Sequence, residues 1–186
     1  MTSQLDIFRS AISDTQDQLM KLHNLLNEFD FPPSKHIKFD ASDIDIENIC
    51  GQIPVGCSGE DYIYIFKVQT DDKISHLFIE FLETERKKQS DLKHKKDLPR
   101  VNYENVGSSY LYVGRSQNLR SRIRQHLSEK YKGTYAMHME RWSCELKVLV
   151  EIEYFKLTGY ESFVIQAIED SLWSKLKPVF GRRGDK

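Results

Sequence analysis

Apolar residues recur every seven positions near the start of the chain, and this pattern predicts a long helix over residues 3–29. One series is Leu5, Ile12, Leu19 and Leu26, and a second series, three residues later, is Phe8, Thr15, Leu22 and Phe29. Only Thr15 interrupts the apolar stripe. Four heptads are enough to support a coiled coil. The stripe therefore predicts either self-association of two copies or docking on the core of the same chain, and the sequence favours neither.

A segment of different composition follows this helix. Pro32 and Pro33 end the helix, because proline lacks an amide hydrogen and restricts the residue before it. An acidic stretch over residues 40–47 then leads into a loop at 51–59 that contains glycine and proline. We therefore expect a helical arm with a linker over residues 1–60, and a folded domain over residues 61–186.

Hydrophobic runs predict three strands in this folded domain. They cover residues 62–68, 110–113 and about 145–155, which are rich in β-branched and aromatic side chains. Helical periodicity predicts helices over 74–88, from Ser116 to about 131, and over about 159–176. Ser116 is a suitable N-cap for the second helix, and Thr158 with Glu161 predicts a capping box for the third. The pattern indicates an α+β protein.

Composition restricts the protein class without naming a function. Hydrophobic residues make up 39% of the chain and charged residues 30%, which is typical of a soluble globular protein. The first ten residues lack a basic region followed by an apolar run, and every apolar stretch falls far short of the ~20 residues that a membrane helix needs. Three scattered cysteines lack the spacing of a zinc site. We expect reduced thiols, no membrane association and a cytoplasmic location.

Charge is distributed unevenly along the chain. Residues 1–61 hold 4 Lys/Arg against 11 Asp/Glu, a net charge of −7, whereas residues 62–186 hold 23 against 17, a net charge of +6. Within the second part, seven cations lie between Arg86 and Arg100. Such a distribution suits a phosphate-binding surface, although a solvated charged face has the same composition.

Two tyrosine motifs and an Arg–His pair stand at defined spacings in the basic part. The first strand contains Tyr62-Ile63-Tyr64, the second contains Tyr112-Val113-Gly114, and Arg122 and His126 follow Gly114 by eight and twelve residues. Arg122 and His126 lie four apart, on one flank of a helix. Glu169 in the last predicted helix precedes Lys177-Pro178. Over about residues 61–181, this order of motifs resembles the catalytic core of the GIY-YIG nuclease family.

The resemblance implies a fold, a reaction and a set of active-site residues. The fold would be a small three-stranded antiparallel sheet flanked by helices, and the reaction would be hydrolysis of a phosphodiester bond. Glu169 would hold one Mg²⁺ or Mn²⁺ ion per active site, which a single carboxylate with waters and phosphate oxygens can do. Tyr64 would take the proton of the attacking water, and Tyr112 would position water or phosphate. Arg122 would bind the phosphate, and His126 would orient Tyr64 or assist proton movement.

The chain departs from the family pattern in three places. Tyr62 stands where the first motif has a glycine, and Val179, Phe180 and Gly181 follow the Lys-Pro where the family commonly has an asparagine. The third departure is the distance between the motifs, because 48 residues separate Tyr64 from Tyr112, far more than in compact members of the family.

This long separation corresponds to a helical and basic insertion at about residues 71–108. Long insertions at this point resemble the type II restriction endonuclease branch of the family, where they help to grip the duplex. We expect seven cations to contact the DNA backbone, which fixes position without reading sequence. They are Lys93, Lys95, Lys96 and Arg100 in the insertion, and Arg115, Arg120 and Arg124 beside the second motif.

The first hypothesis is therefore a metal-dependent DNA endonuclease that cuts double-stranded DNA at specific sequences, as a type II restriction enzyme does. A homodimer, formed through the N-terminal heptads or the insertion, would bring two active sites to the two strands. The alternatives are a nicking or structure-selective repair nuclease, a nucleic-acid-binding module of the same fold without turnover, and an adaptor that acts through its coiled coil.

Overall fold

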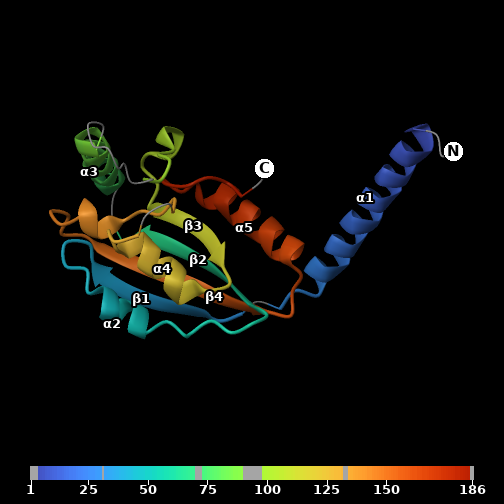
Figure 1. Ribbon diagram of the computed structural model, residues 1–186, viewed down its shortest axis with the longest axis horizontal. Coiled ribbons are helices and arrows are strands. Elements are labelled where there is room, and N and C mark those ends of the chain that lie inside the picture. Colours follow the sequence, from blue (N-terminus) through green and yellow to red (C-terminus); the bar gives the residue numbers. More distant parts are fainter. Residues whose placement is uncertain (1–3, 31, 70–72, 90–97, 132–133, 185–186) are drawn as a thin grey trace.

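The computed structural model describes residues 4–30, 32–69, 73–89, 98–131 and 134–184. Five α-helices lie in these ranges: α1 (Gln4–Asn27), α2 (Ile46–Gly51), α3 (Lys73–Gln89), α4 (Leu119–Leu127) and α5 (Ser162–Leu176). The strands in the same ranges are β1 (Ser34–Asp40), β2 (Glu60–Val68), β3 (Tyr110–Ser116) and β4 (Leu149–Thr158). The predicted α+β class is confirmed (Figure 1).

The strands form one antiparallel sheet in the order β1-β4-β2-β3. The prediction of three strands was wrong, because β1 adds a fourth at the edge beside β4. The segment from Ser34 to Phe39 carries only two apolar residues that face the core, Ile37 and Phe39. Pairing with β4 supplies the hydrogen bonds that make this weakly apolar segment a strand.

Residues 34–51 thus contribute a strand and a helix to the domain, although the sequence assigned them to a linker. Ile49 of α2 is buried in the main core, and the side chain of Asp45 caps α2 by accepting from the amide of Asn48. The division of the chain at residue 60 stays a prediction, but the segment before it is not all linker.

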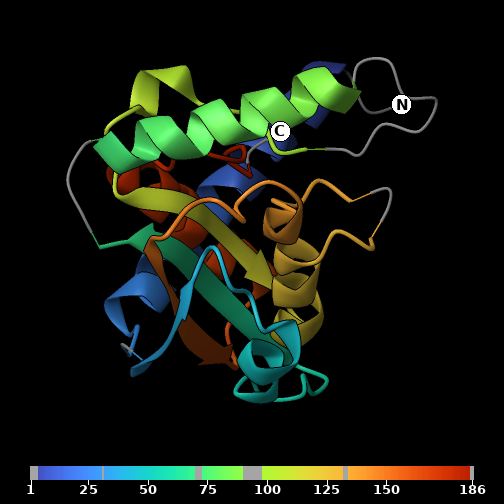
Figure 2. The ribbon, with the colours of Figure 1, turned by 90° about the vertical axis from the view of Figure 1, so that its left-hand side faces the viewer.

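Helices α4 and α5 cover opposite faces of β2 (Figures 1 and 2). Successive side chains of a strand point to opposite faces. Tyr64 and Phe66 join Ile123 of α4 in the main core, whereas Ile63 packs with Ile165 of α5 in a smaller cluster. One strand therefore presents side chains to both helices.

Several predicted boundaries move in the structure. Strand β3 continues through Gly114 to Ser116, and Asn118 rather than Ser116 caps α4, by accepting from the amide of Ser121. Helix α4 ends at Leu127 instead of continuing to about residue 131. The predicted capping box was also wrong, because α5 starts after Glu161 without a side-chain cap hydrogen bond.

The first helix stands away from the domain (Figure 1). It contains no buried residue, and its stripe is exposed to solvent, with Phe8 66% and Leu19 61% exposed. Its C-terminal end is anchored through the ion pair of Lys21 with Glu161 and the tilted ring contact of Phe29 with Tyr160. From Leu5 to Leu19 the stripe therefore does not dock on the core of its own chain, whereas its last residue, Phe29, packs against the smaller cluster that contains Ile63 and Ile165. None of the helices in the described ranges has the length and apolar character of a membrane span.

Candidate active site

The hydroxyl group of Tyr64 lies at the centre of a hydrogen-bonded cluster contributed by three elements. Nε2 of His126 lies 3.0 Å from the Tyr64 hydroxyl oxygen, and Nε of Arg122 donates to the same oxygen at 3.3 Å. The Arg122 guanidinium also reaches the Tyr112 hydroxyl at 3.5 Å. Strands β2 and β3 and helix α4 thus bring together the two tyrosines, the arginine and the histidine that the sequence singled out.

Gly114 makes room for this arrangement. Tyr64 lies opposite Gly114 in the β2–β3 register, and its ring stacks beside that of Tyr112 at 6.1 Å with an interplanar angle of 8°. A Cβ atom at position 114 would lie 2.6 Å from the Tyr64 hydroxyl and 2.8 Å from the Tyr112 ring. The absence of a side chain at position 114 therefore leaves the space that the Tyr64 hydroxyl and the Tyr112 ring occupy.

The hydrogen-bond partners of His126 determine its tautomer. The backbone N–H of Met137 donates to Nδ1 of His126 at 3.3 Å, so Nδ1 must carry a lone pair. Burial lowers the pKa of His126 well below its usual value, and the nearby charges of Arg122 and His138 act in the same direction. The ring is thus neutral, with its proton on Nε2, and it donates to Tyr64.

The Tyr64 hydroxyl therefore accepts two N–H donors and directs its own proton elsewhere. Burial raises the pKa of Tyr64 far above its usual value, and the neighbouring Tyr112 adds to this shift, whereas Arg122 opposes it. The phenol is neutral at rest. Its two donors are nevertheless oriented to stabilise the phenolate once another positive charge approaches.

Glu169 belongs to α5, and its charge reaches the tyrosine cluster. Its carboxylate is close enough to Tyr64 to raise the pKa of the phenol. Burial raises the pKa of Glu169 itself to about 7, and the positive charge of Arg115 opposes this shift. Arg115 in turn forms an ion pair with Asp61 at 3.2 Å and binds Ser162 at the start of α5. The cation that acts on Glu169, Arg115, is therefore already bound to Asp61 and Ser162.

The donor set around Glu169 fits a magnesium or manganese ion that keeps most of its own ligands. Within the residues that the structure describes, no three His, Cys, Asp or Glu side chains are grouped to hold an ion. A cage made entirely of protein ligands is therefore not present in that part of the chain. Magnesium, however, commonly binds through one or two carboxylates together with waters and phosphate oxygens. A partly buried carboxylate with a raised pKa also gains from a nearby cation.

Comparison with protein families gives one match that covers part of the chain. Residues 103–181 match the GIY-YIG catalytic domain. The match supports the GIY-YIG superfamily and, in general terms, nuclease chemistry for this region. It contains Tyr112, Arg122, His126 and Glu169, and it begins after the strand that carries Tyr64. No curated protein and no solved structure matches the chain.

Tyr64 lies outside the matched segment, and the pairing of β2 with β3 brings it to the candidate site. Tyr62, which replaces the glycine of the first GIY-YIG motif, is fully buried, and its hydroxyl donates to Glu60 at 2.6 Å. Its ring packs edge-on against Tyr154 at 6.4 Å. The large side chain at this position is therefore accommodated in the core without displacing Tyr64.

Two asparagines that the sequence analysis missed hold the segment after the Lys-Pro of the GIY-YIG region. The side-chain amides of Asn102 and Asn105 donate to the carbonyl of Pro178 at 2.9 and 3.0 Å, and Asn102 also reaches the carbonyl of Gly181. Both asparagines are buried. They fix the C-terminal segment where this chain lacks the asparagine that the family commonly has at that place, and no local sequence signal links the two segments.

The arginines predicted to bind DNA beside the second GIY-YIG motif are engaged within the protein. Arg115 binds Asp61 and Ser162, Arg120 binds the carbonyl of Ile53, and Arg124 binds Glu47. Their role in DNA binding stays a prediction. Arg100 is exposed beside Tyr112 and Arg122. Lys93, Lys95 and Lys96 lie outside the residues that the structure describes.

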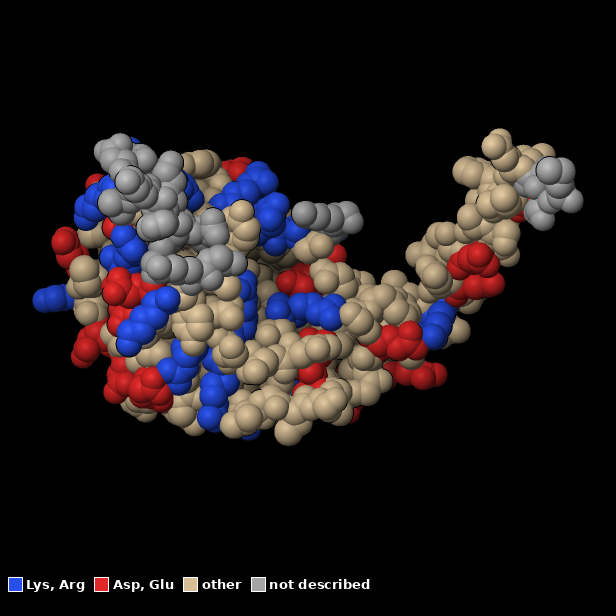
Figure 3. Space-filling model, viewed as in Figure 1, with Lys and Arg blue, Asp and Glu red and all other residues tan. Residues whose placement is uncertain are grey.

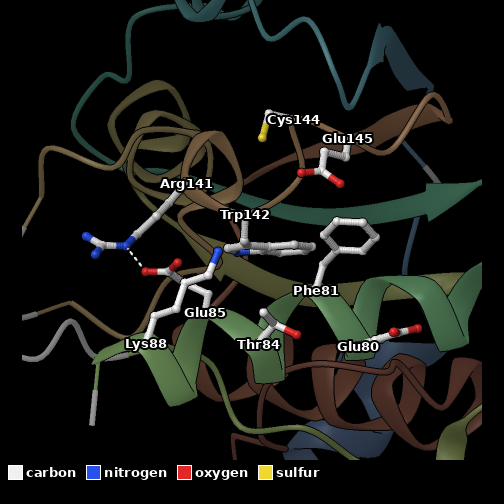
Figure 4. A pocket seen from close by; sticks show the side chains of 9 residues that line it. All are labelled: Glu80, Phe81, Thr84, Glu85, Lys88, Arg141, Trp142, Cys144 and Glu145. Atoms are coloured by element: carbon white, nitrogen blue, oxygen red, sulfur yellow. Dashed lines mark hydrogen bonds and ion pairs between the residues drawn. The ribbon is translucent and has the colours of Figure 1, made fainter. Parts of the chain in front are cut away.

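A separate cavity of about 180 Å³ lies between α3 and the segment after residue 140 (Figure 4). An ion pair joins Glu85 and Arg141 across its wall, and Trp142 and Phe81 supply its apolar side. The candidate catalytic residues Tyr64, Tyr112, Arg122, His126 and Glu169 do not line this cavity, so the candidate chemistry does not involve it.

The raised pKa of Glu169 gives a prediction for the metal-free protein. Its folded-state pKa of about 7 lies above the usual 4.5, so the folded state binds more protons and loses stability as pH rises from about 4.5 to about 7. Glu169→Gln should therefore raise the free energy of unfolding at pH 8 by up to about 3 kcal/mol, and leave it almost unchanged at pH 4. Urea denaturation in EDTA measures both values.

The same pair of proteins tests the metal site without any turnover. At pH 8, millimolar Mg²⁺ or Mn²⁺ should raise the melting temperature of the unmodified protein, because a ligand of the folded state stabilises it, and should not change that of Glu169→Gln. Glu161→Gln, on the exposed start of α5, is the matched control. Equal effects of both substitutions, at both pH values and with metal, would contradict the assignment of Glu169.

Proposed function

We propose that this protein is a divalent-metal-dependent endonuclease that hydrolyses phosphodiester bonds in double-stranded DNA, with the sequence specificity of a type II restriction enzyme. The observation that supports this most strongly is the convergence of Arg122 and His126 on the hydroxyl oxygen of Tyr64, with Tyr112 in contact with Arg122 and the charge of Glu169 acting on the same phenol. These residues come from four elements of the fold, and titratable groups with strongly shifted pKa values that are brought together in this way are typical of a functional site.

In this proposal, substrate binding rearranges the contacts of Arg122. The guanidinium contacts to Tyr64 and Tyr112 are long, at 3.3 and 3.5 Å, and are therefore weaker than its bonds to the Gln125 side chain and the Tyr135 carbonyl, at 2.8 and 3.0 Å. A phosphate oxygen offers a stronger, charge-assisted partner to the same guanidinium. As Arg122 turns to the phosphate, it gives up its contact with the hydroxyl of Tyr64, which is buried in the free protein.

Tyr64 then loses the proton of its released hydroxyl to solvent and takes a proton from the attacking water, and the leaving oxygen of the phosphodiester is protonated by solvent. The His126 Nε2–H holds the Tyr64 oxygen and favours its ionised form, because it donates to the negative charge. His126 cannot serve as the base itself, since its remaining lone pair on Nδ1 is used by the amide of Met137. Arg122 neutralises charge that develops on the phosphate. An ion held by Glu169 would supply further positive charge to the phosphate oxygens.

Plasmid cleavage tests the proposed reaction. The protein should convert supercoiled plasmid or phage DNA to nicked or linear products with Mg²⁺ or Mn²⁺ and not in EDTA. Tyr64→Phe removes the proton-exchanging oxygen and Glu169→Gln removes the carboxylate charge, so each should lower the rate at least about 100-fold while DNA binding stays within about twofold. Tyr160→Phe and Glu161→Gln, at the junction of α1 and α5, are the controls and should cut at the wild-type rate.

The products separate the alternatives within this proposal. Discrete sequenced ends support a restriction-like enzyme, whereas scattered ends indicate a nicking or structure-selective nuclease. Binding without any cleavage across these substrates and metals would indicate a nucleic-acid-binding module of the same fold. Wild-type rates in Tyr64→Phe or Glu169→Gln would contradict the residue assignments.

We further propose that two copies pair through α1 and so bring two active sites to the two DNA strands. The stripe of α1 is exposed along a helix of 24 residues, about 36 Å at 1.5 Å per residue. With Leu5 in the first core position of the heptad, the flanking positions next to the seam carry Arg9, Gln16 and His23 on one side and Gln4, Ala11, Gln18 and Leu25 on the other. These positions hold no pair of like charges at neutral pH, so a second copy meets no repulsion there.

Light scattering after size-exclusion chromatography tests this pairing. The full chain should run as a dimer, and Ile12→Glu with Leu19→Glu should produce monomers, because each replaces an apolar seam residue with a charge. The control carries Ser10→Glu and Asn24→Glu, which lie on the outer side of the same helix, and should remain dimeric. A monomeric wild-type chain, or a seam variant that stays dimeric, would contradict pairing through α1.

A further inference from the structure

A basic groove of about 640 Å³ extends from the candidate active site to the C-terminal segment. Tyr112 and Arg122 line its inner end, and Arg100, Tyr135, Arg182 and Arg183 line the remainder. The groove therefore continues directly from the residues to which the proposed function assigns the scissile phosphate. It is separate from the cavity of Figure 4.

The walls of this groove suit an anionic ligand. Four arginines line it, and among the described residues that line it there is no Asp or Glu. Figure 3 shows Lys and Arg side chains gathered over the upper middle of the domain, near the end of the chain, whereas acidic side chains lie mainly along its lower left edge and on α1. A polyanion that enters at the active site therefore finds further positive charge along the groove.

The C-terminal segment is held in position to form one wall. The amides of Val179 and Phe180 donate to carbonyl groups of β3 at 2.9 and 2.8 Å, and the amide of Gly181 donates to the carbonyl of Arg100 at 2.9 Å. Gly181 has a φ of +97°, and a Cβ atom there would lie 2.8 Å from the Tyr112 ring. The backbone therefore turns closely around Tyr112 before Arg182 enters the groove.

Tyr135 gives the groove an exposed aromatic face. Its side chain is 63% exposed, and its carbonyl accepts from Arg122 at 3.0 Å, so the residue is attached to the active-site arginine. The Arg182 guanidinium lies 5.8 Å from the centre of the Tyr135 ring. An aromatic ring paired with arginine in a basic groove is the arrangement on which unpaired nucleobases stack.

We propose that this groove binds the DNA strand next to the scissile phosphate, with Arg100 and Arg182 on backbone phosphates and Tyr135 stacked on a base that has left the duplex stack. This inference rests on the proposed endonuclease function and specifies its substrate. The nucleotides beside the cleavage position are unstacked when bound, either because the enzyme opens the duplex there or because the DNA is already unpaired.

The stacking role is tested by fluorescence anisotropy in EDTA, with full-length Glu169→Gln protein as the background and a labelled single-stranded oligonucleotide as the probe. Adding Tyr135→Ala should weaken binding about tenfold, since one stacked base contributes about 1–3 kcal/mol, and should weaken binding to an intact duplex less. Tyr135→Phe keeps the ring and should bind as the background does. Tyr103→Ala is the matched control, because Tyr103 is 61% exposed but lies outside the groove.

The phosphate contacts are tested in the same assay by varying salt. Arg182→Ala should lower the slope of log affinity against log salt by about 0.7 on single strands, as expected for one lost contact, and Arg9→Ala on α1 should leave it unchanged. Unchanged single-strand affinity in Tyr135→Ala would overturn the inference.

The two proposals fail in different ways. Plasmid cleavage by the wild type, together with unchanged single-strand affinity in Tyr135→Ala, would remove the groove and leave the endonuclease standing. Weakened single-strand binding in Tyr135→Ala, without cleavage by the wild type under any condition, would keep the groove and remove the enzyme.

Discussion

The candidate site depends on one constraint, the acceptance of two N–H donors by the buried hydroxyl oxygen of Tyr64. That oxygen can be reached from α4 only because Tyr64 stands on a central strand and points to the face that α4 covers. It is also close to the next strand only because residue 114 has no side chain. Arg122 and His126 meet it together because residues four apart share one flank of a helix. The amide of Met137 then fixes the proton of His126 on the nitrogen that faces Tyr64.

Burial gives this cluster its electrostatic character. Folding removes both Tyr64 and Glu169 from water and so raises the pKa of each group, and an additional positive charge nearby favours the anionic form of both. Burial also keeps His126 neutral, because it lowers the pKa of a group whose protonated form carries the charge. In the proposed reaction, a cation and a phosphate therefore enter the site together. The arginines of the adjoining groove are placed to favour that step, and the proposed binding of the DNA strand and the proposed hydrolysis are therefore linked through Arg122.

The sequence predicted those parts of the fold and site that depend on local spacing. The heptads of α1, the central strand that carries Tyr64, and the flank shared by Arg122 and His126 all follow from periodicity within one element. Strand β1 was missed because Ile37 and Phe39 alone give a weak apolar signal, and its pairing with β4 joins residues more than a hundred positions apart.

The same limit explains why the sequence revealed neither the groove nor the internal contacts of the arginines. Tyr135 and Arg182 are ordinary loop residues until the C-terminal segment is laid along β3, and Asn102 and Asn105 become anchors only when Pro178 arrives beside them. Arg120 and Arg124 appear as available cations in the sequence, but tertiary contacts with Ile53 and Glu47 engage both. The spacing of residues within one element could therefore be interpreted from the sequence, whereas contacts between distant segments could not be predicted from it.

The position of the proton on His126 determines whether Tyr64 accepts from both donors, and NMR of the imidazole nitrogens measures that position directly. A long-range ¹H–¹⁵N spectrum of the metal-free protein at pH 7.5 should show His126 as the neutral tautomer with Nε2 protonated and Nδ1 bare. Replacing Tyr64 with Phe should shift the Nε2 resonance and leave that of Nδ1 nearly unchanged. A proton on Nδ1, or a doubly protonated ring at that pH, would contradict a Tyr64 oxygen that accepts from both His126 and Arg122.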